Sequence, residues 1–286
     1  AALIGDAYRS KPFDPQNKYS VAYTWGLVCI VYNRTMVDEG DLEQGWGILW
    51  DEKYAGQVLM FNNSRDAFAI AGKLLGNSIN PGSVQEIEQA AEKLKEQKSV
   101  VQSYVMDEVF DKMGGGEAAL APYYVGDGVT MMADNPDLAM FIPAEGTNIY
   151  IDAMCIPKGC QNKEGAEAFI NFLCRPEISA ANLDYIGYST PETAAKDYLD
   201  EDVTSSPVSY PDDETLARSE SFAELGVGAT QTMNDLWLSV KTSTSNTTLY
   251  LVLTITAIAA VILFFLISGI IKRRKKARRC RKWRQT

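Results

Sequence analysis

The stretch Gln57–Gly76, QVLMFNNSRDAFAIAGKLLG, gives the clearest indication of the fold class. Its first five residues, QVLMF, are an apolar run typical of a short buried strand. In residues 64–75, SRDAFAIAGKLL, the apolar side chains recur at helical spacing, and Gly76 ends the helix. A strand, a polar loop and a helix in this order are the unit from which α/β domains are built.

Further strands and helices alternate on both sides of this stretch. Residues 19–32, YSVAYTWGLVCIVY, are rich in β-branched and aromatic residues and predict a strand that Gly26 interrupts. Ser83 and Glu86 form a capping box that predicts a helix over residues 84–97. The remaining pattern predicts strands at 117–124, 138–142 and 148–156, and a helix at 163–174 that Pro176 ends. No internal repeat is present, and the whole pattern predicts an α/β fold.

The composition excludes several classes of function. The chain has 286 residues, of which 46% are apolar, so it is not a disordered protein. Histidine is absent, which removes Ser-His-Asp and Cys-His catalysis and the commonest metal ligand. The glycine cluster at 114–116 lacks the spacing of a phosphate-binding loop and predicts a turn. We expect the scattered cysteines to be buried single thiols rather than a metal site or a disulfide: Cys29, Cys155, Cys160, Cys174 and Cys280.

Charge is divided unevenly along the chain. The net charge is −10, from 27 basic and 37 acidic side chains, yet residues 272–286 hold ten of the basic groups and no acid. The preceding 271 residues therefore carry a net charge of −20. Such a body repels nucleic acid and attracts cations.

The uncharged segment 248–271, TLYLVLTITAIAAVILFFLISGII, is long enough to cross a bilayer as a helix. The basic segment 272–286 follows it at once, and such segments stay in the cytoplasm. The sequence therefore predicts a single-pass protein whose first 240 residues lie outside, joined to the membrane by a polar linker at 241–247. Since the chain opens AALIGDAY, without an initiator Met or a signal peptide, we expect it to be a fragment, either of a longer precursor or of a larger membrane protein such as a fusion of permease and binding protein.

Aromatic and acidic residues recur together at the ends of predicted strands. They occur in PYYVGDG, NIYIDA and IGYSTP, which contain Tyr123, Tyr124, Asp127, Tyr150, Asp152 and Tyr188. A single strand Tyr is more often a packing residue, and a single loop Asp is more often a cap or a turn residue.

The order of these segments resembles the polyamine (spermidine/putrescine) substrate-binding proteins of ABC importers. The resemblance runs from Lys11 to about Ser219, and its most specific part is the stretch 150–191. It implies a two-lobed, periplasmic-binding-protein-like (type II) clamp whose first lobe is incomplete. The implied divisions are 1–26 (remainder of the first lobe and crossover), 27–148 (second lobe) and 149–240 (return to the first lobe and C-terminal helices).

The resemblance also implies the residues that bind ligand. Carboxylates would bind the ammonium groups of a polyamine, and aromatic faces would pack against its methylene groups. Asn63 and Asp66 match an acidic pair of the family, of which only Asp66 keeps the charge. Tyr124 and Tyr150 match two positions where the family commonly has Trp. The remaining candidates are Asp152 (the central carboxylate), Tyr188, Asp127 (which could restore the charge lost at Asn63) and Trp25 (a wall of the cleft).

These observations predict a non-catalytic, membrane-tethered protein that binds polyamine outside the cytoplasm and delivers it to an ABC permease, with no cofactor and no metal. The alternatives are a related two-lobed protein for another ligand, such as oxidised iron or an anion, and an extracellular enzyme that uses Asp127 and Asp152. The acidic body disfavours an anion, and the absence of His disfavours iron. A signalling receptor is also disfavoured, because the cytoplasmic tail is too short to hold a domain.

Overall fold

The computed structural model describes residues 3–243, 252–256, 258, 259 and 263. The chain divides into two units, Ala1–Thr242 and Ser243–Thr286. The first unit contains all the strands named below and the candidate site.

Strand β1 (Ser20–Asn33) is the longest strand and belongs to two groups of strands. Its second half pairs antiparallel with β4 (Leu120–Tyr124) and β5 (Leu138–Phe141), whereas its first half pairs antiparallel with β6 (Ile149–Cys155). Gly26 does not interrupt the strand as expected: it pairs with Tyr150 inside the ladder, and the irregularity falls between Ala22 and Thr24 instead.

We call the larger group of elements the large lobe, residues 28–141 together with α9 (Val227–Thr242). Its strands follow the order β3-β2-β4-β1-β5, and β2 (Val58–Phe61) is parallel to β3 (Val101–Val105) and to β4. Its other helices are α1 (Ser64–Leu74), α2 (Val84–Glu96), α3 (Glu108–Gly114) and α4 (Val125–Asp134), with 3-10 helices at Glu39–Trp50, Glu52–Tyr54 and Gln97–Ser99.

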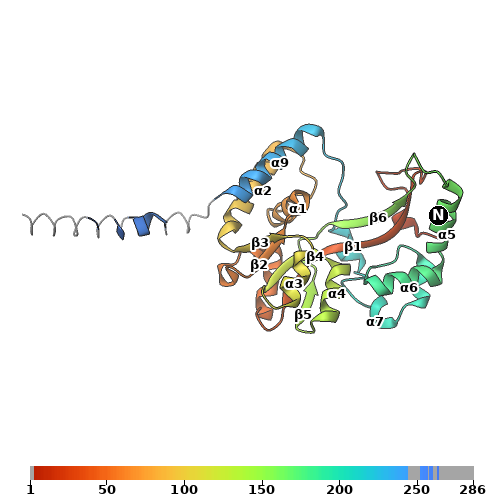
Figure 1. Cartoon of the computed structure of the whole chain (residues 1–286), viewed down its shortest axis with the longest axis horizontal. Helices are drawn as coiled ribbons and strands as arrows, with labels where there is room; N and C mark the ends of the chain where they lie inside the picture. Colours follow the sequence, from red (N-terminus) through yellow and green to blue (C-terminus); the bar gives the residue numbers. More distant parts are fainter. Residues whose placement is uncertain (1–2, 244–251, 257, 260–262, 264–286) are drawn as a thin grey trace, which may run out of the picture. The chain divides into compact units, whose positions relative to one another are not determined.

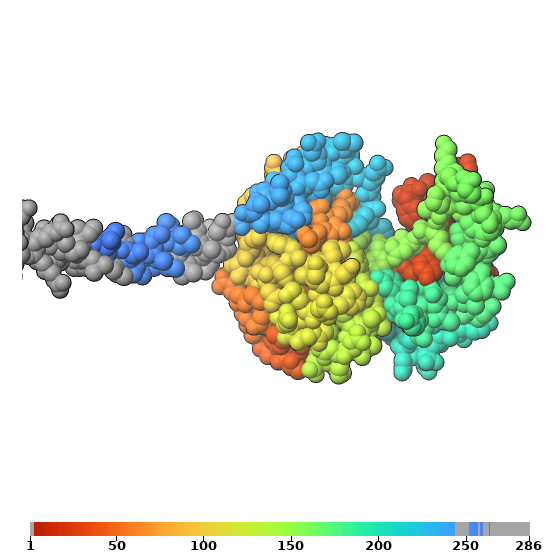
Figure 2. All heavy atoms as spheres, viewed as in Figure 1, coloured from red at the N-terminus to blue at the C-terminus, as the bar shows by residue number. Residues whose placement is uncertain are grey.

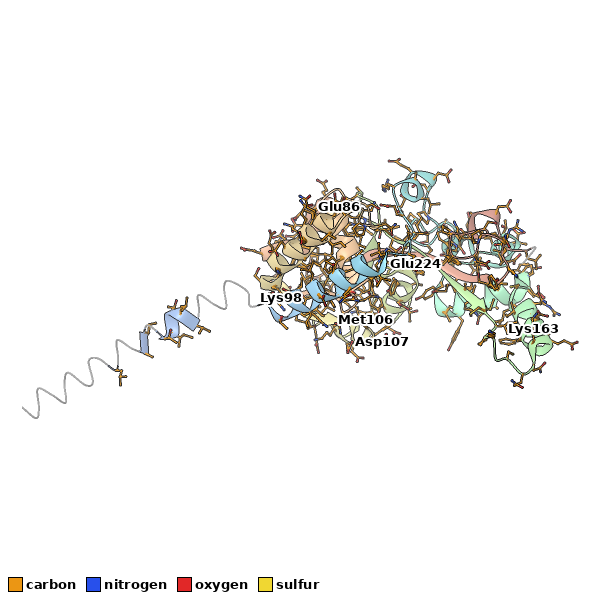
Figure 3. The ribbon with its side chains drawn as sticks, turned by 90° about the horizontal axis from the view of Figure 1, so that it is seen from above. Glu86, Lys98, Met106, Asp107, Lys163 and Glu224 are labelled. Carbon is orange, nitrogen blue, oxygen red and sulfur yellow. The ribbon has the colours of Figure 1, made fainter. Side chains whose placement is uncertain are left out.

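We call residues 3–27 and 149–210 the small lobe. In this lobe the first half of β1 pairs with β6, and helices lie beside these two strands, as Figure 1 shows. In Figure 3, Lys163 marks the start of α5 in this lobe, and Glu86 and Lys98 lie in the large lobe. The helices are α5 (Lys163–Leu173), α6 (Pro176–Ile186), α7 (Glu201–Thr204) and the 3-10 helices Asp6–Tyr8 and Thr193–Tyr198; α8 (Asp213–Ala217) leads back to the large lobe.

Three segments connect the lobes and are hydrogen-bonded side by side. The Val28 N–H donates to the Asn148 carbonyl over 3.1 Å, so β1 is joined to the segment that leads into β6. The N–H of Ile149 donates to the Glu220 carbonyl, and the N–H of Glu220 donates to the Thr147 carbonyl, at 2.7 and 2.9 Å. The segment around Glu220 is thereby the third member of the connection.

Helix α9 packs on the large lobe, beside α2 (Figure 1). Trp237 is buried and meets the rings of Phe68 and Tyr104 edge-on. The expected boundaries at 26, 148 and 240 stay a prediction, although the last helix of the predicted segment 149–240 lies on the large lobe. Helix α9 also extends to Thr242, so the first residues of the expected linker 241–247 are helical.

Most predicted elements are confirmed within one or two residues. The strand expected at 117–124 begins only at Leu120, because Glu117 follows the turn that ends α3. Pro176 ends α5 as expected and also occupies the first turn of α6, where a missing N–H costs nothing. Among the residues described here, none of the helices has the length and apolarity needed to cross a membrane. The predicted span 248–271 lies mostly outside those residues, and the tail 272–286 lies entirely outside them.

Candidate functional site

The carboxyl ends of the parallel strands β2, β3 and β4 meet at one edge of the large-lobe sheet. A helix follows each of these strands and carries acidic side chains in its first turn, where the helix dipole favours negative charge. Ligands of open α/β sheets bind at this edge. The acidic residues gathered here are Asp66 in α1, Asp107 and Glu108 at α3, and Asp127 in α4.

Asp66 is the most deeply buried of these carboxylates, with 4% of its surface exposed. The Tyr124 hydroxyl donates a hydrogen bond to its Oδ2 over 3.0 Å. Burial raises the pKa of Asp66 to about 6, although the Tyr124 hydrogen bond and the neighbouring Arg65 act in the opposite direction. Asn63 is the N-cap of α1, and its side-chain oxygen accepts from the Arg65 N–H at 2.9 Å; its contact with ligand stays a prediction.

Three tyrosine rings form a continuous row across the two lobes. The Tyr124 and Tyr150 rings meet edge to face with their centroids 5.3 Å apart, and the Tyr150 and Tyr188 rings do so at 6.2 Å. Burial raises the pKa of all three phenols, so each hydroxyl keeps its proton at neutral pH. Figure 2 shows the lobes apart along one edge and in contact along the opposite edge, where α4 meets α6.

Asp127 lies at the Tyr188 end of the row. The Tyr188 hydroxyl donates to its Oδ1 over 3.0 Å. Burial raises the pKa of Asp127, the Tyr188 hydrogen bond lowers it, and the negative charges of Asp107 and Asp152 raise it further. A cation bound beside Asp127 would offset this repulsion.

Strand β6 presents alternate residues to this same region. Asp152 accepts a hydrogen bond from the Thr24 hydroxyl at 2.6 Å, across the β1–β6 ladder. Two residues earlier, Tyr150 lies over Gly26, where a Cβ atom would come within 2.4 Å of its hydroxyl oxygen. The Tyr150 hydroxyl is buried and has no hydrogen-bond partner. An unpartnered buried donor of this kind is where a ligand would make a hydrogen bond.

Trp25 lies on the other face of β1. Its neighbours Thr24 and Gly26 pair with the two β6 residues of the site, so period-2 alternation turns Trp25 away from them. The side chain is 3% exposed, packs against Tyr8 and Tyr210, and donates from Nε1 to the Thr190 carbonyl. The structure therefore brings the other acidic and aromatic candidates together but buries Trp25 away from them, against Tyr8 and Tyr210.

Two residues beside the other candidates were missed by sequence reasoning: Thr24 and Asp107. Alternation along the predicted strand could have indicated Thr24, because it shares a face with Gly26. Asp107 follows β3, a strand that the sequence analysis did not predict.

The site contains groups that can bind an organic cation. In the described part of the chain, no group of three or more Cys, Asp or Glu side chains is placed to hold a metal. Cys29 and Cys174 are buried thiols as expected, but Cys155 and Cys160 are exposed, because β6 and the turn after it lie at the surface. Carboxylates beside a row of aromatic rings provide charge pairing and cation-π contact for ammonium groups.

A family model described as bacterial extracellular solute-binding protein matches residues 3–217. The chain belongs to this family. It is a family of solute-binding proteins and not of enzymes, in agreement with the expectation from the sequence.

Solute-binding proteins of named specificity are among the relatives. The chain is 34% identical over 217 residues to the spermidine/putrescine-binding periplasmic protein of Salmonella typhimurium, and 33% identical over 220 residues to that of Escherichia coli. These alignments cover 76% and 77% of this chain and 62% and 63% of the relatives, so the chain spans about three fifths of their length.

Solved structures of solute-binding proteins have the same fold. A spermidine/putrescine ABC transporter substrate-binding protein from Streptococcus pneumoniae aligns with a TM-score of 0.77 at 34% identity, over 84% of this chain and 74% of that one. A putative spermidine/putrescine ABC transporter from Listeria monocytogenes aligns with a TM-score of 0.78 at 32% identity, with the same coverage. The α/β, periplasmic-binding-protein-like fold expected from the sequence is confirmed.

Proposed function

We propose that this protein binds a polyamine of the spermidine/putrescine class outside the cytoplasm and delivers it to the permease of an ABC importer. The observation that carries the proposal is the row of Tyr124, Tyr150 and Tyr188 between the carboxylates of Asp66, Asp127 and Asp152. A polyamine needs this combination, since its ammonium groups pair with carboxylates and its methylene groups pack on rings. The names of the relatives support the same ligand class.

The sharing of the site between the lobes supports a role in transport. Asp66, Tyr124 and Asp127 come from the large lobe, whereas Tyr188 and Asp152 come from the small lobe. A ligand that contacts both groups would favour the closed arrangement, and a permease can recognise that arrangement. The ligand is bound and released without any chemical reaction.

We further propose that segment 248–271 tethers the protein to the membrane, with the tail 272–286 in the cytoplasm. The uncharged run and the ten basic groups that follow it support this topology. Protease added to intact cells should remove the binding domain and leave a tag after Thr286 protected. Digestion of that tag would contradict the proposed topology.

A thermal unfolding series tests the ligand class. Spermidine and putrescine should raise the Tm of the intact protein, because a ligand that binds only the folded state stabilises it by about 2.7 kcal/mol at a hundred times its Kd. Glutamate, sulfate and Fe(III) citrate serve as controls for the anion and iron alternatives. A Tm that rises with one of these controls and with neither polyamine would contradict the proposal.

A further inference from the structure

Three carboxylates of the site each accept a hydrogen bond from a neutral hydroxyl group. Among the residues that the structure describes, no Lys or Arg forms an ion pair with any of them. A neutral donor orients a carboxylate without cancelling its charge, whereas a Lys or Arg partner would do both. The pairs of donor and acceptor are Tyr124 with Asp66, Tyr188 with Asp127 and Thr24 with Asp152.

Thr24 is a rigid donor. Its side chain is 2% exposed, and branching at Cβ restricts rotation about its first side-chain torsion. Thr24 and Asp152 lie directly opposite each other in the antiparallel β1–β6 ladder, and 2.6 Å separates Thr24 Oγ1 from Asp152 Oδ2. The sheet therefore holds the Thr24 hydroxyl at a set position beside the carboxylate.

Asp152 has little else to fix its carboxylate. The residue is exposed, and rotation about the terminal torsion of an aspartate is only weakly restricted. In the described part of the chain, no group other than the Thr24 hydroxyl donates a hydrogen bond to its side chain. The bond thus engages Oδ2 and leaves Oδ1 to accept from a ligand.

A β-bulge adjoins this pair of residues. The register of the β1–β6 ladder shifts between Ala22 and Thr24, so Tyr23 is an extra residue of β1. Asn182 in α6 donates from Nδ2 to the Tyr23 hydroxyl and so anchors the bulge. Bulges next to binding sites re-aim neighbouring side chains. The position of the Thr24 hydroxyl therefore depends on the bulge beside it.

The pair shares a face of the ladder with the middle ring of the tyrosine row. Tyr150 comes two residues before Asp152 in β6, and Gly26 comes two residues after Thr24 in β1. Because side chains alternate along a strand, these four residues lie on one face. The Asp152 carboxylate that Thr24 orients is therefore on the same side of the sheet as the Tyr150 ring.

We propose that Thr24 is a positioning residue for polyamine binding: its hydroxyl holds Asp152 Oδ2 so that Oδ1 accepts a hydrogen bond from an ammonium group of the ligand. This inference rests on the proposed function. The hydroxyl restricts the rotation of the carboxylate before the ligand arrives and leaves its charge for the ligand. Binding then costs less conformational entropy than it would with a freely rotating side chain.

Titration calorimetry with spermidine on the intact protein tests the inference. Thr24→Val keeps the shape of the side chain and removes the hydroxyl, whereas Thr24→Ser keeps the hydroxyl. Asp152→Ala, alone and combined with Thr24→Val, completes a double-mutant cycle. Thr35→Val is the matched control, because the Thr35 hydroxyl also donates to a side-chain oxygen, that of Asn33, in the turn after β1.

The Thr24→Val variant should bind spermidine about three- to tenfold more weakly, the cost of ordering one side chain on binding. Thr24→Ser and Thr35→Val should both bind within about twofold of the wild type. In the Asp152→Ala background, Thr24→Val should change the affinity by less than about twofold, because no carboxylate remains to be oriented. Thr24→Val should also keep the wild-type dependence of affinity on salt, since the charge of the site is unchanged.

Three results would overturn the inference while leaving the proposed function intact. The first is a Thr24→Val or Asp152→Ala affinity within about twofold of the wild type. The second is an equal loss from Thr24→Val with and without Asp152, which would mean that the hydroxyl supports the β1–β6 ladder and not the carboxylate. The third is a Thr24→Ser affinity as weak as that of Thr24→Val. A folded wild-type protein that binds no di- or triamine would overturn both proposals.

Discussion

The Tyr188 hydroxyl donates a hydrogen bond to Asp127 Oδ1 over 3.0 Å and thereby links the two lobes. Tyr188 follows α6 in the small lobe, and Asp127 lies in the first turn of α4 in the large lobe. The Tyr188 ring also lies against Gly126, where an added Cβ would come within 2.1 Å of it. One tyrosine therefore both orients a carboxylate of the site and holds the lobes together.

Replacing Tyr188 with Phe should weaken polyamine binding. The variant loses the hydrogen bond that lowers the Asp127 pKa and that joins the lobes, which corresponds to about 1 kcal/mol, or roughly fivefold in Kd. Calorimetric titration with spermidine at pH 7.5 measures the change. Tyr185→Phe is the matched control, because Tyr185 lies three residues earlier and is 89% exposed. Equal affinities for the two variants would contradict this role of Tyr188.

Replacing Asp66 with Asn should stabilise the ligand-free protein at neutral pH. Since the folded-state pKa of about 6 lies above the ordinary value of 3.8, the contribution of Asp66 to stability is fully present below pH 4 and is lost as the pH rises through 6. The cost at pH 7.5 is about 3 kcal/mol. Urea unfolding should therefore show a more stable Asp66→Asn variant at pH 7.5 and little difference at pH 4. A variant that is less stable at pH 7.5 would show that the charge has a partner inside the protein.

Polyamine affinity should fall as the solution is acidified through pH 6. An ammonium group binds the ionised form of Asp66, so protonation competes with the ligand and costs up to tenfold in affinity per pH unit. Titrations of spermidine between pH 5 and 8 measure this dependence. The Asp66→Asn variant should bind more weakly throughout, with a shallower decline that reflects the raised pKa of Asp127. A wild-type affinity that stays constant over this range would exclude Asp66 from the binding of the cation.

The contact between Gly26 and Tyr150 should make Gly26 intolerant of substitution. In Gly26→Ala the new Cβ would lie 2.4 Å from the Tyr150 hydroxyl oxygen, so the ring must leave its place in the row. We expect a stability loss of about 1 to 3 kcal/mol and at least a tenfold loss of spermidine affinity. Gly40→Ala is the control, because nothing lies within 4 Å of its added Cβ. If both variants bind spermidine as the wild type does, the position of Tyr150 is unimportant for binding.

Much of the fold could be predicted because local signals and tertiary contacts agree. The long β-branched and aromatic run became β1, and the Ser83 cap begins α2, with the Ser83 hydroxyl accepting from the Glu86 N–H. The prediction that Gly26 interrupts the strand was wrong because glycine occurs in strands for two reasons: it can break the hydrogen-bond ladder, or it can make room for an aromatic ring. Only the pairing with Tyr150 decides between them, and that pairing joins residues far apart in the sequence.

The acidic and aromatic candidates could be named from the resemblance, but their arrangement could not be predicted. The neighbours Trp25 and Thr24 illustrate the difference. The resemblance implied that the tryptophan forms a wall of the cleft, whereas strand alternation turns Thr24 toward Asp152 and buries Trp25 against Tyr8 and Tyr210. Asn63 likewise matched a position in the family pattern, yet its side-chain oxygen caps α1. Whether a side chain caps a helix, and to which side of a strand it points, depend on backbone geometry, which the residue types alone do not give.

The most direct test of the proposed function is calorimetric titration of the intact protein with spermidine at low and high salt. The account predicts one ligand bound per protein, an affinity that weakens as salt screens the carboxylates, and no chemical change in the recovered amine. A folded protein that gives no binding heat with spermidine, putrescine or any other di- or triamine at either salt concentration would contradict it.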